Sequence, residues 1–353
     1  MTLYDQVADL PLTVEGYDLS RLEGETSSDF TRVSTVFTLY GPERAGSGED
    51  VTYDTPDHDA LLGADPDADR FPLAGEYTLD SFSSALADVD LFPTKEPERG
   101  VSKHYRRWAL EGAALDLALR QAGETLASAL GRRDDPVSFV VSTRLGEPPT
   151  TDRIEQVLDV DGDIAFKLDP TPEWTPELAA RVAELAPVRI LDLKGLYEGT
   201  EVDAEPDPAL YELVLETFPD AVVEDPALTD ETRPLFDGHE ERVSWDYPVT
   251  GVESVEKLPF EPEWLNVKPS RFGTVESLFD TVEYARERDI RLYGGGQFEL
   301  GVGRRQLHAL AAALYPDGPN DLAPRGYNTP EVRSGVPVSP LKPPAEPTGF
   351  DWQ

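Results

Sequence analysis

From residue 137 onward, short apolar runs alternate with longer segments in which apolar residues recur every three or four positions. The apolar runs begin near Val137, Ile164, Val188, Ala221, Val243, Trp264, Ile290 and, more weakly, Leu322. Between them, the segments 175–186, 207–218, 274–288 and 304–314 have the periodicity of amphipathic helices. This alternation predicts repeated strand–helix units.

The spacing of these units favours a closed barrel. Successive apolar runs start 21 to 33 residues apart, and a (β/α)8 barrel of about 250 residues uses about 31 residues per unit. A doubly wound sheet is the competing arrangement, but its glycine-rich first turn is missing from this chain. We therefore expect an α/β fold with a TIM-like barrel over residues 131–327.

The first part of the chain, residues 1–130, has a different pattern. Residues 12–17 and 31–40 are apolar and β-branched runs with partial alternation, which predicts strands. Residues 105–122 have a strong amphipathic pattern that predicts a helix, and Gly123 supplies its stop. Residues 328–353 are rich in proline, so we expect a tail lying over the surface or on the N-terminal part, rather than a recognition motif.

Composition and charge limit the partners of the protein. The 353 residues include 69 Asp plus Glu against 31 Lys plus Arg, for a formal net charge of -38. Such a chain is a poor ligand for nucleic acid or an anionic membrane surface, because both require clustered cations. The acidity resembles that of halophilic proteins from a salt-loaded cytoplasm, where acidic side chains keep the surface hydrated. The composition does not fix the oligomeric state and is compatible with a homo-oligomer.

The sequence lacks a membrane or signal segment and lacks cysteine, which limits where the protein is located and which catalytic groups it can use. The sequence has no run of about 20 apolar residues and no positively charged start of a signal peptide, so we expect a cytoplasmic protein. It also has no cysteine, which excludes disulfides, thiolate nucleophiles and cysteine metal sites.

The ends of the predicted strands carry the candidate chemistry, because active sites of barrels lie at the carboxyl ends of their strands. Five consecutive strands end at or near Lys167, Asp192, Glu224, Asp246 and Lys268. Three converging carboxylates repel one another unless a cation lies between them, and oxygen ligands alone favour Mg²⁺ over zinc. A desolvated lysine beside a cation can act as a base near neutral pH.

The lysines are better evidence for a functional site than the acids, because any single acid in this chain is expected to be a solvated surface residue. The chain has only seven lysines: Lys95, Lys103, Lys167, Lys194, Lys257, Lys268 and Lys342. Three of them, Lys167, Lys194 and Lys268, fall at or beside strand ends on one predicted face of the barrel.

Several stretches resemble the enolase superfamily, in its muconate-lactonizing-enzyme and o-succinylbenzoate-synthase branch. They are RWALEGAALDLALRQAG (107–123), IAFKLDPTPEW (164–174), LDLKGLY (191–197), VVEDP (222–226), WLNVKPSRFG (264–273) and YGGGQFELGVG (293–303). The likeness spans about residues 10 to 327. Two features support it: the order of the stretches, and the gaps of 32, 22 and 22 residues from Asp192 through Glu224 and Asp246 to Lys268.

The resemblance implies an α+β capping domain over residues 1–130 and a modified barrel. It implies removal of the proton α to a carboxylate with a metal-stabilised enolate, as in a lyase, racemase or cycloisomerase. Asp192, Glu224 and Asp246 would then be Mg²⁺ ligands, and Lys167 and Lys268 the acid/base pair acting on a small-molecule carboxylate.

The chain departs from the family pattern at three positions. The family has Lys-x-Lys on its second barrel strand, whereas this chain has one lysine, Lys167, which we align with the second, catalytic lysine. If Lys167 is instead the first lysine, Asp169 replaces the base. The family's Asp-Glu-Ser is Asp246-Tyr247-Pro248 here.

The third departure is Lys194, which stands where the family's Asp-x-Asn has asparagine. Because it lies two residues after Asp192, its ammonium faces the same side of the strand. It could bind the substrate carboxylate, or neutralise the carboxylates in place of Mg²⁺. The second case predicts a metal-independent or non-catalytic protein that binds a small carboxylate.

The resemblance also implicates Glu299 and two loops of the capping domain. Glu299 matches a family glutamate that reaches the site, and the preceding glycines, 294–296, either allow close approach to a ligand or make a tight turn. By the resemblance, specificity loops of the capping domain would lie at Leu19–Asp29 and Gly48–Asp59, both polar and acidic. The four histidines share no cluster, and we assign them no role.

Overall fold

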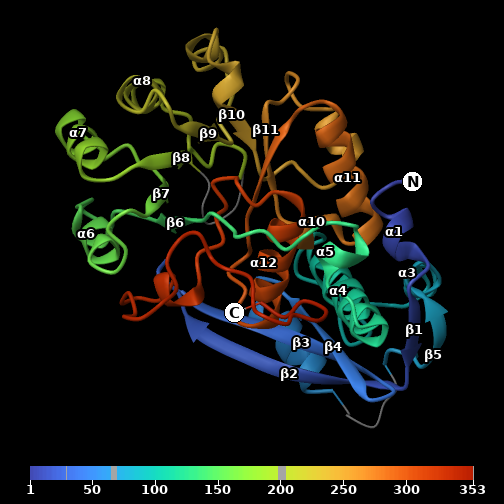
Figure 1. Ribbon diagram of the computed structural model, residues 1–353. Coiled ribbons are helices and arrows are strands. Elements are labelled where there is room, and N and C mark those ends of the chain that lie inside the picture. The colour runs from blue at the N-terminus through green and yellow to red at the C-terminus, as the bar shows by residue number, and fades with distance from the viewer. Residues whose placement is uncertain (29, 65–69, 198–203, 353) are drawn as a thin grey trace.

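The computed structural model describes residues 1–28, 30–64, 70–197 and 204–352 of the chain (Figure 1). A curved parallel sheet with helices on its outer side makes up most of the C-terminal part, and two smaller antiparallel sheets belong to the N-terminal part (Figure 1). This architecture confirms the expected TIM-like barrel with an N-terminal α+β capping domain. Among the described residues, no helix is long and apolar enough to cross a membrane.

The capping domain contains two antiparallel sheets. Their strands are β1 (Pro11–Val14) paired with β5 (Gly75–Thr78), and β2 (Gly16–Glu25), β3 (Thr31–Gly41) and β4 (Arg44–Asp50) in that order. The run predicted over 31–40 is confirmed as β3. The run over 12–17 is divided between β1 and the start of β2.

The expected specificity loops are loops only in part, because only residues 26–28 and 51–54 of the described ranges lie outside strands and helices. Residues 19–25 belong to β2, which pairs with β3 along its whole length, and residues 48–50 belong to β4. Side chains of β2 are exposed or half-buried throughout, so this edge strand lacks the buried apolar positions that mark a strand in sequence. Asp29, the end of the first expected loop, lies outside the described residues.

The helices of the capping domain are α1 (Asp5–Ala8), α2 (Thr55–Leu62), α3 (Leu79–Ala87), α4 (Ser102–Ala122) and α5 (Leu126–Ala129). Helix α4 is the predicted helix, and it ends at Gly123 with the left-handed φ of 74° that favours glycine. It packs closely on β4 because Gly48 has no side chain. A Cβ at this position would lie 1.9 Å from the carbonyl oxygen of Ala109 in the helix.

The barrel sheet contains seven parallel strands in sequential order. They are β6 (Val140–Thr143), β7 (Ala165–Leu168), β8 (Val188–Asp192), β9 (Val222–Glu224), β10 (Val243–Trp245), β11 (Trp264–Val267) and β12 (Arg291–Gly294). Isolated bridges fill the eighth position, where the weak run near Leu322 was predicted. The N–H of Asp321 donates to the carbonyl of Gly294 at 2.8 Å, and the N–H of Val140 donates to the carbonyl of Asn320 at 2.8 Å. These bonds close the sheet.

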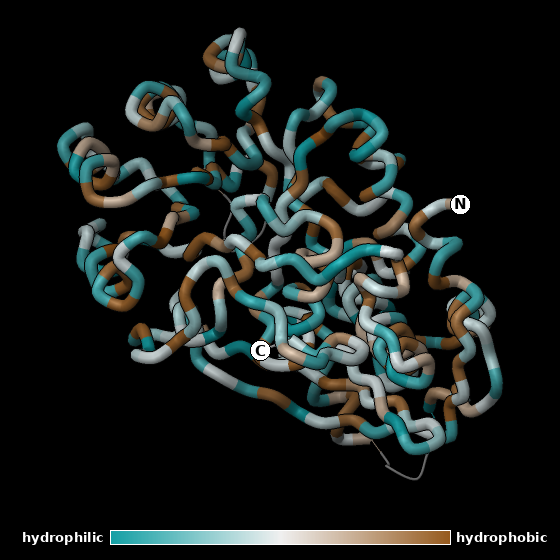
Figure 2. The backbone as a smooth tube through the Cα atoms, viewed as in Figure 1, coloured by the Kyte–Doolittle hydropathy of each residue, from teal (hydrophilic) through white to brown (hydrophobic). Residues whose placement is uncertain are grey.

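The helices of this part are α6 (Asp152–Leu158), α7 (Pro176–Leu185), α8 (Pro208–Thr217), α9 (Val252–Val255), α10 (Pro269–Phe272), α11 (Val275–Glu287) and α12 (Val302–Leu314). Side chains of Thr175, Asp207 and Thr274 accept backbone N–H bonds at the starts of α7, α8 and α11, as N-caps do. Hydrophobic and hydrophilic residues alternate along the outer helices, consistent with one buried face (Figure 2).

Connections between the capping domain and the barrel include one at Glu49 and one along the proline-rich tail. The carboxylate of Glu49, in β4, accepts bonds from the N–H groups of Leu300 at 2.6 Å, Gly301 at 2.9 Å and Gly303 at 3.0 Å around the start of α12. A helix start favours a negative charge, so this contact fixes β4 against the segment that follows β12.

The proline-rich tail supplies the second connection. Leu341 bridges to Val137 before β6, and the N–H of Gly349 donates to the carbonyl of Glu124 after α4 at 2.8 Å. Phe350 and Trp352 are both buried. The tail therefore runs from the barrel to the capping domain and packs on both.

Candidate active site

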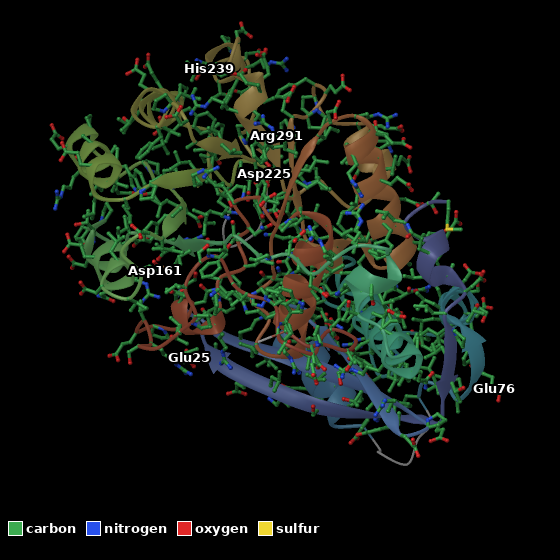
Figure 3. The ribbon with its side chains drawn as sticks, viewed as in Figure 1. Glu25, Glu76, Asp161, Asp225, His239 and Arg291 are labelled. Atoms are coloured by element: carbon green, nitrogen blue, oxygen red, sulfur yellow. The ribbon has the colours of Figure 1, made fainter. Side chains whose placement is uncertain are left out.

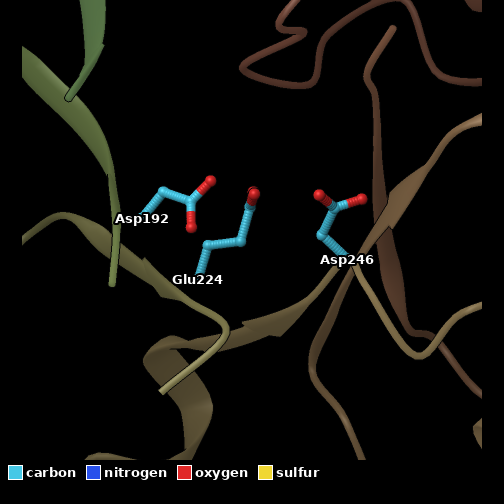
Figure 4. A group of neighbouring side chains, drawn as sticks. All are labelled: Asp192, Glu224 and Asp246. Carbon is cyan, nitrogen blue, oxygen red and sulfur yellow. The ribbon is translucent and has the colours of Figure 1, made fainter. Parts of the chain in front are cut away.

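Three buried carboxylates meet at the carboxyl edge of the barrel sheet. Asp192 ends β8, Glu224 ends β9 and Asp246 directly follows β10, so parallel neighbouring strands bring them to one edge. One carboxylate oxygen of each lies within 4.8 Å of the others, and none of the three residues is exposed to solvent. Figure 4 shows Glu224 between the two aspartates. The structure thus brings together the three predicted metal ligands.

The two predicted catalytic lysines contact opposite members of this carboxylate trio. Lys167, in β7, has its Nζ 3.1 Å from an oxygen of Asp192 and also bonds Glu224. Lys268, directly after β11, has its Nζ 2.8 Å from an oxygen of Asp246. Burial lowers the pKa of Lys167, but the charges of Glu224 and Asp192 outweigh it and hold that pKa well above its usual value.

Lys194 also reaches the trio. Its ammonium bonds the Oδ2 of Asp192 and lies 3.7 Å from the Oδ1 of Asp169. Its backbone has a left-handed φ of 55°, and its N–H donates to the Oδ1 of Asp192 at 3.2 Å. Burial raises the pKa of Asp192, but Lys194 and Lys167 outweigh this effect, so the carboxyl stays ionised.

Asp246 has two further partners that the sequence did not indicate. Arg271, in α10, bonds its Oδ1 at 2.9 Å, and the hydroxyl of Tyr197 donates to its Oδ2 at 2.9 Å. Arg271 also donates to the Tyr197 oxygen at 3.2 Å. Both residues lie in segments beyond the strand ends, which the strand pattern of the sequence does not place. The position of Arg271 three residues after Lys268 is the signal that could have identified it.

Glu224 is held by two more partners, from strands β11 and β12. The hydroxyl of Tyr293 donates to its Oε2, and the side-chain amide of Asn266 donates to the same oxygen at 3.2 Å. Burial and the nearby Asp192 raise the pKa of Glu224, against the effect of Lys167. Asn266 lies two residues before Lys268 in an alternating strand, so strand periodicity placed it on the same face.

Asp225 positions the end of the next strand. Its carboxylate accepts the N–H of Asp246 at 2.9 Å and that of Tyr247 at 2.8 Å, and its backbone has a left-handed φ of 47°. Burial and the charges of Asp246 and Asp192 raise its pKa to about 7. Figure 3 shows Asp225 near the inner part of the barrel, whereas His239 lies toward its outer rim.

Glu299 is buried, and its side chain bonds a residue close in sequence. Its Oε1 accepts the N–H of Gln297 at 2.9 Å, and its Oε2 accepts no hydrogen bond among the described residues. The glycines before it allow close packing, because a Cβ at Gly295 would lie 2.5 Å from the Oδ1 of Asn266 and 2.8 Å from the Cε of Lys268. The glycine run therefore packs against site residues, with no left-handed turn at these positions.

The trio has the chemistry of a site for a hard divalent cation. It offers oxygen donors only, from three strands, with all three residues buried and close together. Carboxylates that merely solvate a surface are exposed, and these are not. Lys194 contacts one ligand and Lys268 another, so ammonium groups compete for the same oxygens.

Comparisons with known proteins agree with this architecture. The C-terminal domain of a domain of unknown function, DUF8230, matches residues 133–329, and its N-terminal domain matches residues 5–129. The chain is 27% identical over 262 residues to an o-succinylbenzoate synthase of Geobacillus kaustophilus, covering 68% of this chain and 67% of that protein.

Solved structures give the same result for the fold. Muconate cycloisomerase from Pseudomonas fluorescens superposes with a TM-score of 0.64 at 18% identity, covering 96% of each chain. A dipeptide epimerase from Enterococcus faecalis superposes with a TM-score of 0.64 at 14% identity, covering 88% of this chain and 90% of that one. The resemblance to the enolase superfamily is thereby confirmed at the level of the fold.

Proposed function

The chain belongs to the DUF8230 family and has the fold of the enolase superfamily, and from this premise we propose that it is an enzyme acting on a small carboxylic acid. The proposed step is removal of the proton α to the carboxylate, as in a lyase, racemase or cycloisomerase. The observation that carries the proposal is the placement of Lys167 and Lys268 on opposite members of the buried carboxylate trio.

Asp192, Glu224 and Asp246 would hold the divalent ion, for which we propose Mg²⁺. When bound, the ion supplies a positive charge that stabilises the negative charge developing on the substrate carboxylate. The trio alone would repel that carboxylate, so the surrounding ammonium and guanidinium groups also contribute to substrate binding.

The lysines would move the proton. Lys167 carries a proton in the arrangement described, because Glu224 and Asp192 raise its pKa. We assign Lys167 and Lys268 as the acid/base pair, since each can reach a substrate bound between them. Lys194 and Glu299 are proposed to contact the substrate at the edge of the site.

Exchange of the α-proton tests this function. Wild-type protein with Mg²⁺ should exchange the α-proton of at least one member of a carboxylic-acid library into deuterated water, followed by mass spectrometry or NMR. Lys268→Ala should lower that rate by about 10²- to 10⁴-fold, because general acid–base catalysis contributes that much. Asp246 keeps Arg271 and Tyr197 as partners in this variant, so the fold should survive.

A matched control removes a lysine far from the site. Lys257 pairs with Glu253 on the surface, so Lys257→Ala should leave the exchange rate unchanged. An exchange rate that Lys268→Ala does not lower would remove Lys268 from the proposed mechanism.

One contact favours a second candidate function, a metal-independent protein that binds a small carboxylate. The ammonium of Lys194 bonds Asp192 directly, so it can neutralise that carboxylate in place of a metal ion. Such a protein would bind members of the same library in the presence of EDTA and catalyse no exchange. Calorimetry with and without EDTA separates this candidate from the metal-assisted enzyme.

A further inference from the structure

Lys194 lies between two carboxylates and bonds only one of them. Its Nζ contacts the Oδ2 of Asp192, and the Oδ1 of Asp169 is 3.7 Å away on the other side. Asp169 directly follows β7, the strand next to β8, so both acids lie at the same edge of the sheet. A side-chain rotation is therefore enough to bring the ammonium from one carboxylate to the other.

Asp169 has an unused acceptor for this ammonium. Its Oδ2 pairs with Arg144 at 3.1 Å, but its Oδ1 is buried and accepts no hydrogen bond from any described residue. A buried carboxylate oxygen without a donor is costly, so a second position for the Lys194 ammonium would be stabilised there.

Lys194 is also the cation most able to leave Asp192. The Oδ2 of Asp192 is shared with Lys167, whose side chain is only 1% exposed and is bound to Glu224 as well. The side chain of Lys194 is 17% exposed. Its backbone is fixed by the bond from its N–H to Asp192 and by the N–H of Gly195 donating to the carbonyl of Asp225 at 3.0 Å. The side chain can move while the backbone stays in place.

We propose that Lys194 is an exchangeable internal cation, whose ammonium neutralises Asp192 when no divalent ion is bound and moves to the Oδ1 of Asp169 when one binds. The inference rests on the proposed function, because it takes Asp192, Glu224 and Asp246 as the metal ligands. A divalent ion at Asp192 repels an ammonium in contact with the same oxygen, which supplies the force for the displacement. Lys194 thereby lowers the affinity for the metal, and Asp169 partly restores it.

Calorimetric titration of the full-length chain with Mg²⁺ alone tests this proposal in four proteins: wild type, Lys194→Met, Asp169→Asn and the double variant. Lys194→Met should bind Mg²⁺ about tenfold more tightly than wild type, because the competing charge is gone. Asp169→Asn should bind it a few-fold more weakly, because the displaced ammonium loses the negative charge of its partner. In the Lys194→Met background, Asp169→Asn should change the affinity little, the non-additivity expected of coupled residues.

Lys257→Met is the matched control, since it removes one positive charge from an exposed ion pair elsewhere. Its Mg²⁺ affinity should equal that of wild type, which separates a local effect of Lys194 from a change in net charge.

The outcomes distinguish this inference from the function on which it rests. Equal, measurable Mg²⁺ affinity in wild type and Lys194→Met would overturn the exchangeable cation and leave the metal-assisted function standing. If Asp169→Asn lowers the Mg²⁺ affinity equally in wild type and in Lys194→Met, the exchangeable cation is overturned too. The loss would then come from the removed negative charge of Asp169 and not from its contact with Lys194. No Mg²⁺ binding in any of the four proteins would overturn both.

Discussion

The capping domain and the barrel each bury ion pairs, and they do so in opposite ways. In the capping domain, Arg106 bonds Asp50 at 2.8 Å, and neither side chain is exposed. The second oxygen of Asp50 accepts the N–H and hydroxyl of Thr52, and Arg106 also donates to the carbonyl of Leu91 at 3.0 Å. One cation meets one carboxylate, and their remaining hydrogen-bonding atoms are used locally.

The barrel site has no such one-to-one match. Lys167, Lys194, Lys268 and Arg271 share the three carboxylates of the trio, and Lys167 contacts two of them. Lys167 also lies 3.6 Å from Asp321, and Lys194 lies 3.7 Å from Asp169. Nearby polar atoms accept or donate nothing among the described residues, including the Oδ1 of Asn266 and the Nε2 of Gln297. The Arg106–Asp50 pair has the one-to-one match of a structural ion pair. The shared cations and the polar atoms without partners at the barrel edge instead fit a site that takes up further partners.

Breaking the structural pair should have the largest effect on stability. Arg106→Met leaves Asp50 buried without its cation, so the free energy of unfolding should fall by about 3–5 kcal/mol. Denaturant unfolding measures this loss. The Mg²⁺ affinity of the fraction that remains folded should be unchanged, and a change there would mean that the two regions are coupled.

Changing the middle carboxylate of the trio should affect function instead. Glu224→Gln removes a charge that the proposed metal ion and Lys167 both use, so α-proton exchange should fall by about 10²-fold or more. The folded state should persist, because the amide can still accept from Tyr293 and Asn266. Exchange rates and circular dichroism of the same sample separate the two effects. Exchange at the wild-type rate would show that Glu224 has no part in the reaction.

Acid should weaken the structural pair in a defined pH range. Burial opposes ionisation of Asp50, but Arg106 outweighs it and holds the pKa of that carboxyl below its usual value. Its contribution to stability is therefore full above an unfolded-state pKa of about 3.9 and is lost as the pH falls through the lower, folded-state pKa. The free energy of unfolding should fall less steeply between about pH 5 and pH 3 in Asp50→Asn than in wild type. The two slopes should differ by up to about 1.4 kcal/mol per pH unit. Parallel curves for the two proteins would contradict this assignment.

An exposed ion pair should contribute almost nothing to stability or to α-proton exchange. Lys257 bonds Glu253 at 2.7 Å, but both side chains are more than two-thirds exposed, at 71% and 83%. Lys257→Ala should therefore change the unfolding free energy by less than about 0.5 kcal/mol. A larger loss, measured by denaturant unfolding, would mean that surface charge in this acidic chain carries more stability than its geometry indicates.

Sequence patterns predicted the barrel well, because its strands are buried and its helices have one buried face. The runs at Ile164, Val188 and Trp264 became strands β7, β8 and β11. Most of strand β2 was missed, because an edge strand with exposed or half-buried side chains lacks a continuous apolar signal.

The same limits apply to the site. Residues at strand ends were predicted correctly as neighbours, since parallel strands fix which ends meet. Tyr197 and Arg271 were not found, because they reach Asp246 from segments beyond the strands, and no periodicity places such side chains. The contact of Lys194 with Asp192 was anticipated from their two-residue spacing, whereas the nearby Oδ1 of Asp169 required the structure.

A crystal structure of the wild-type protein in saturating Mg²⁺ would show the metal site and the position of Lys194 together. The proposed mechanism requires an ion about 2.0–2.1 Å from oxygens of Asp192, Glu224 and Asp246, with the Lys194 ammonium moved to the Oδ1 of Asp169. A structure with no ion among the three carboxylates, and with Lys194 still bonded to Asp192, would contradict it.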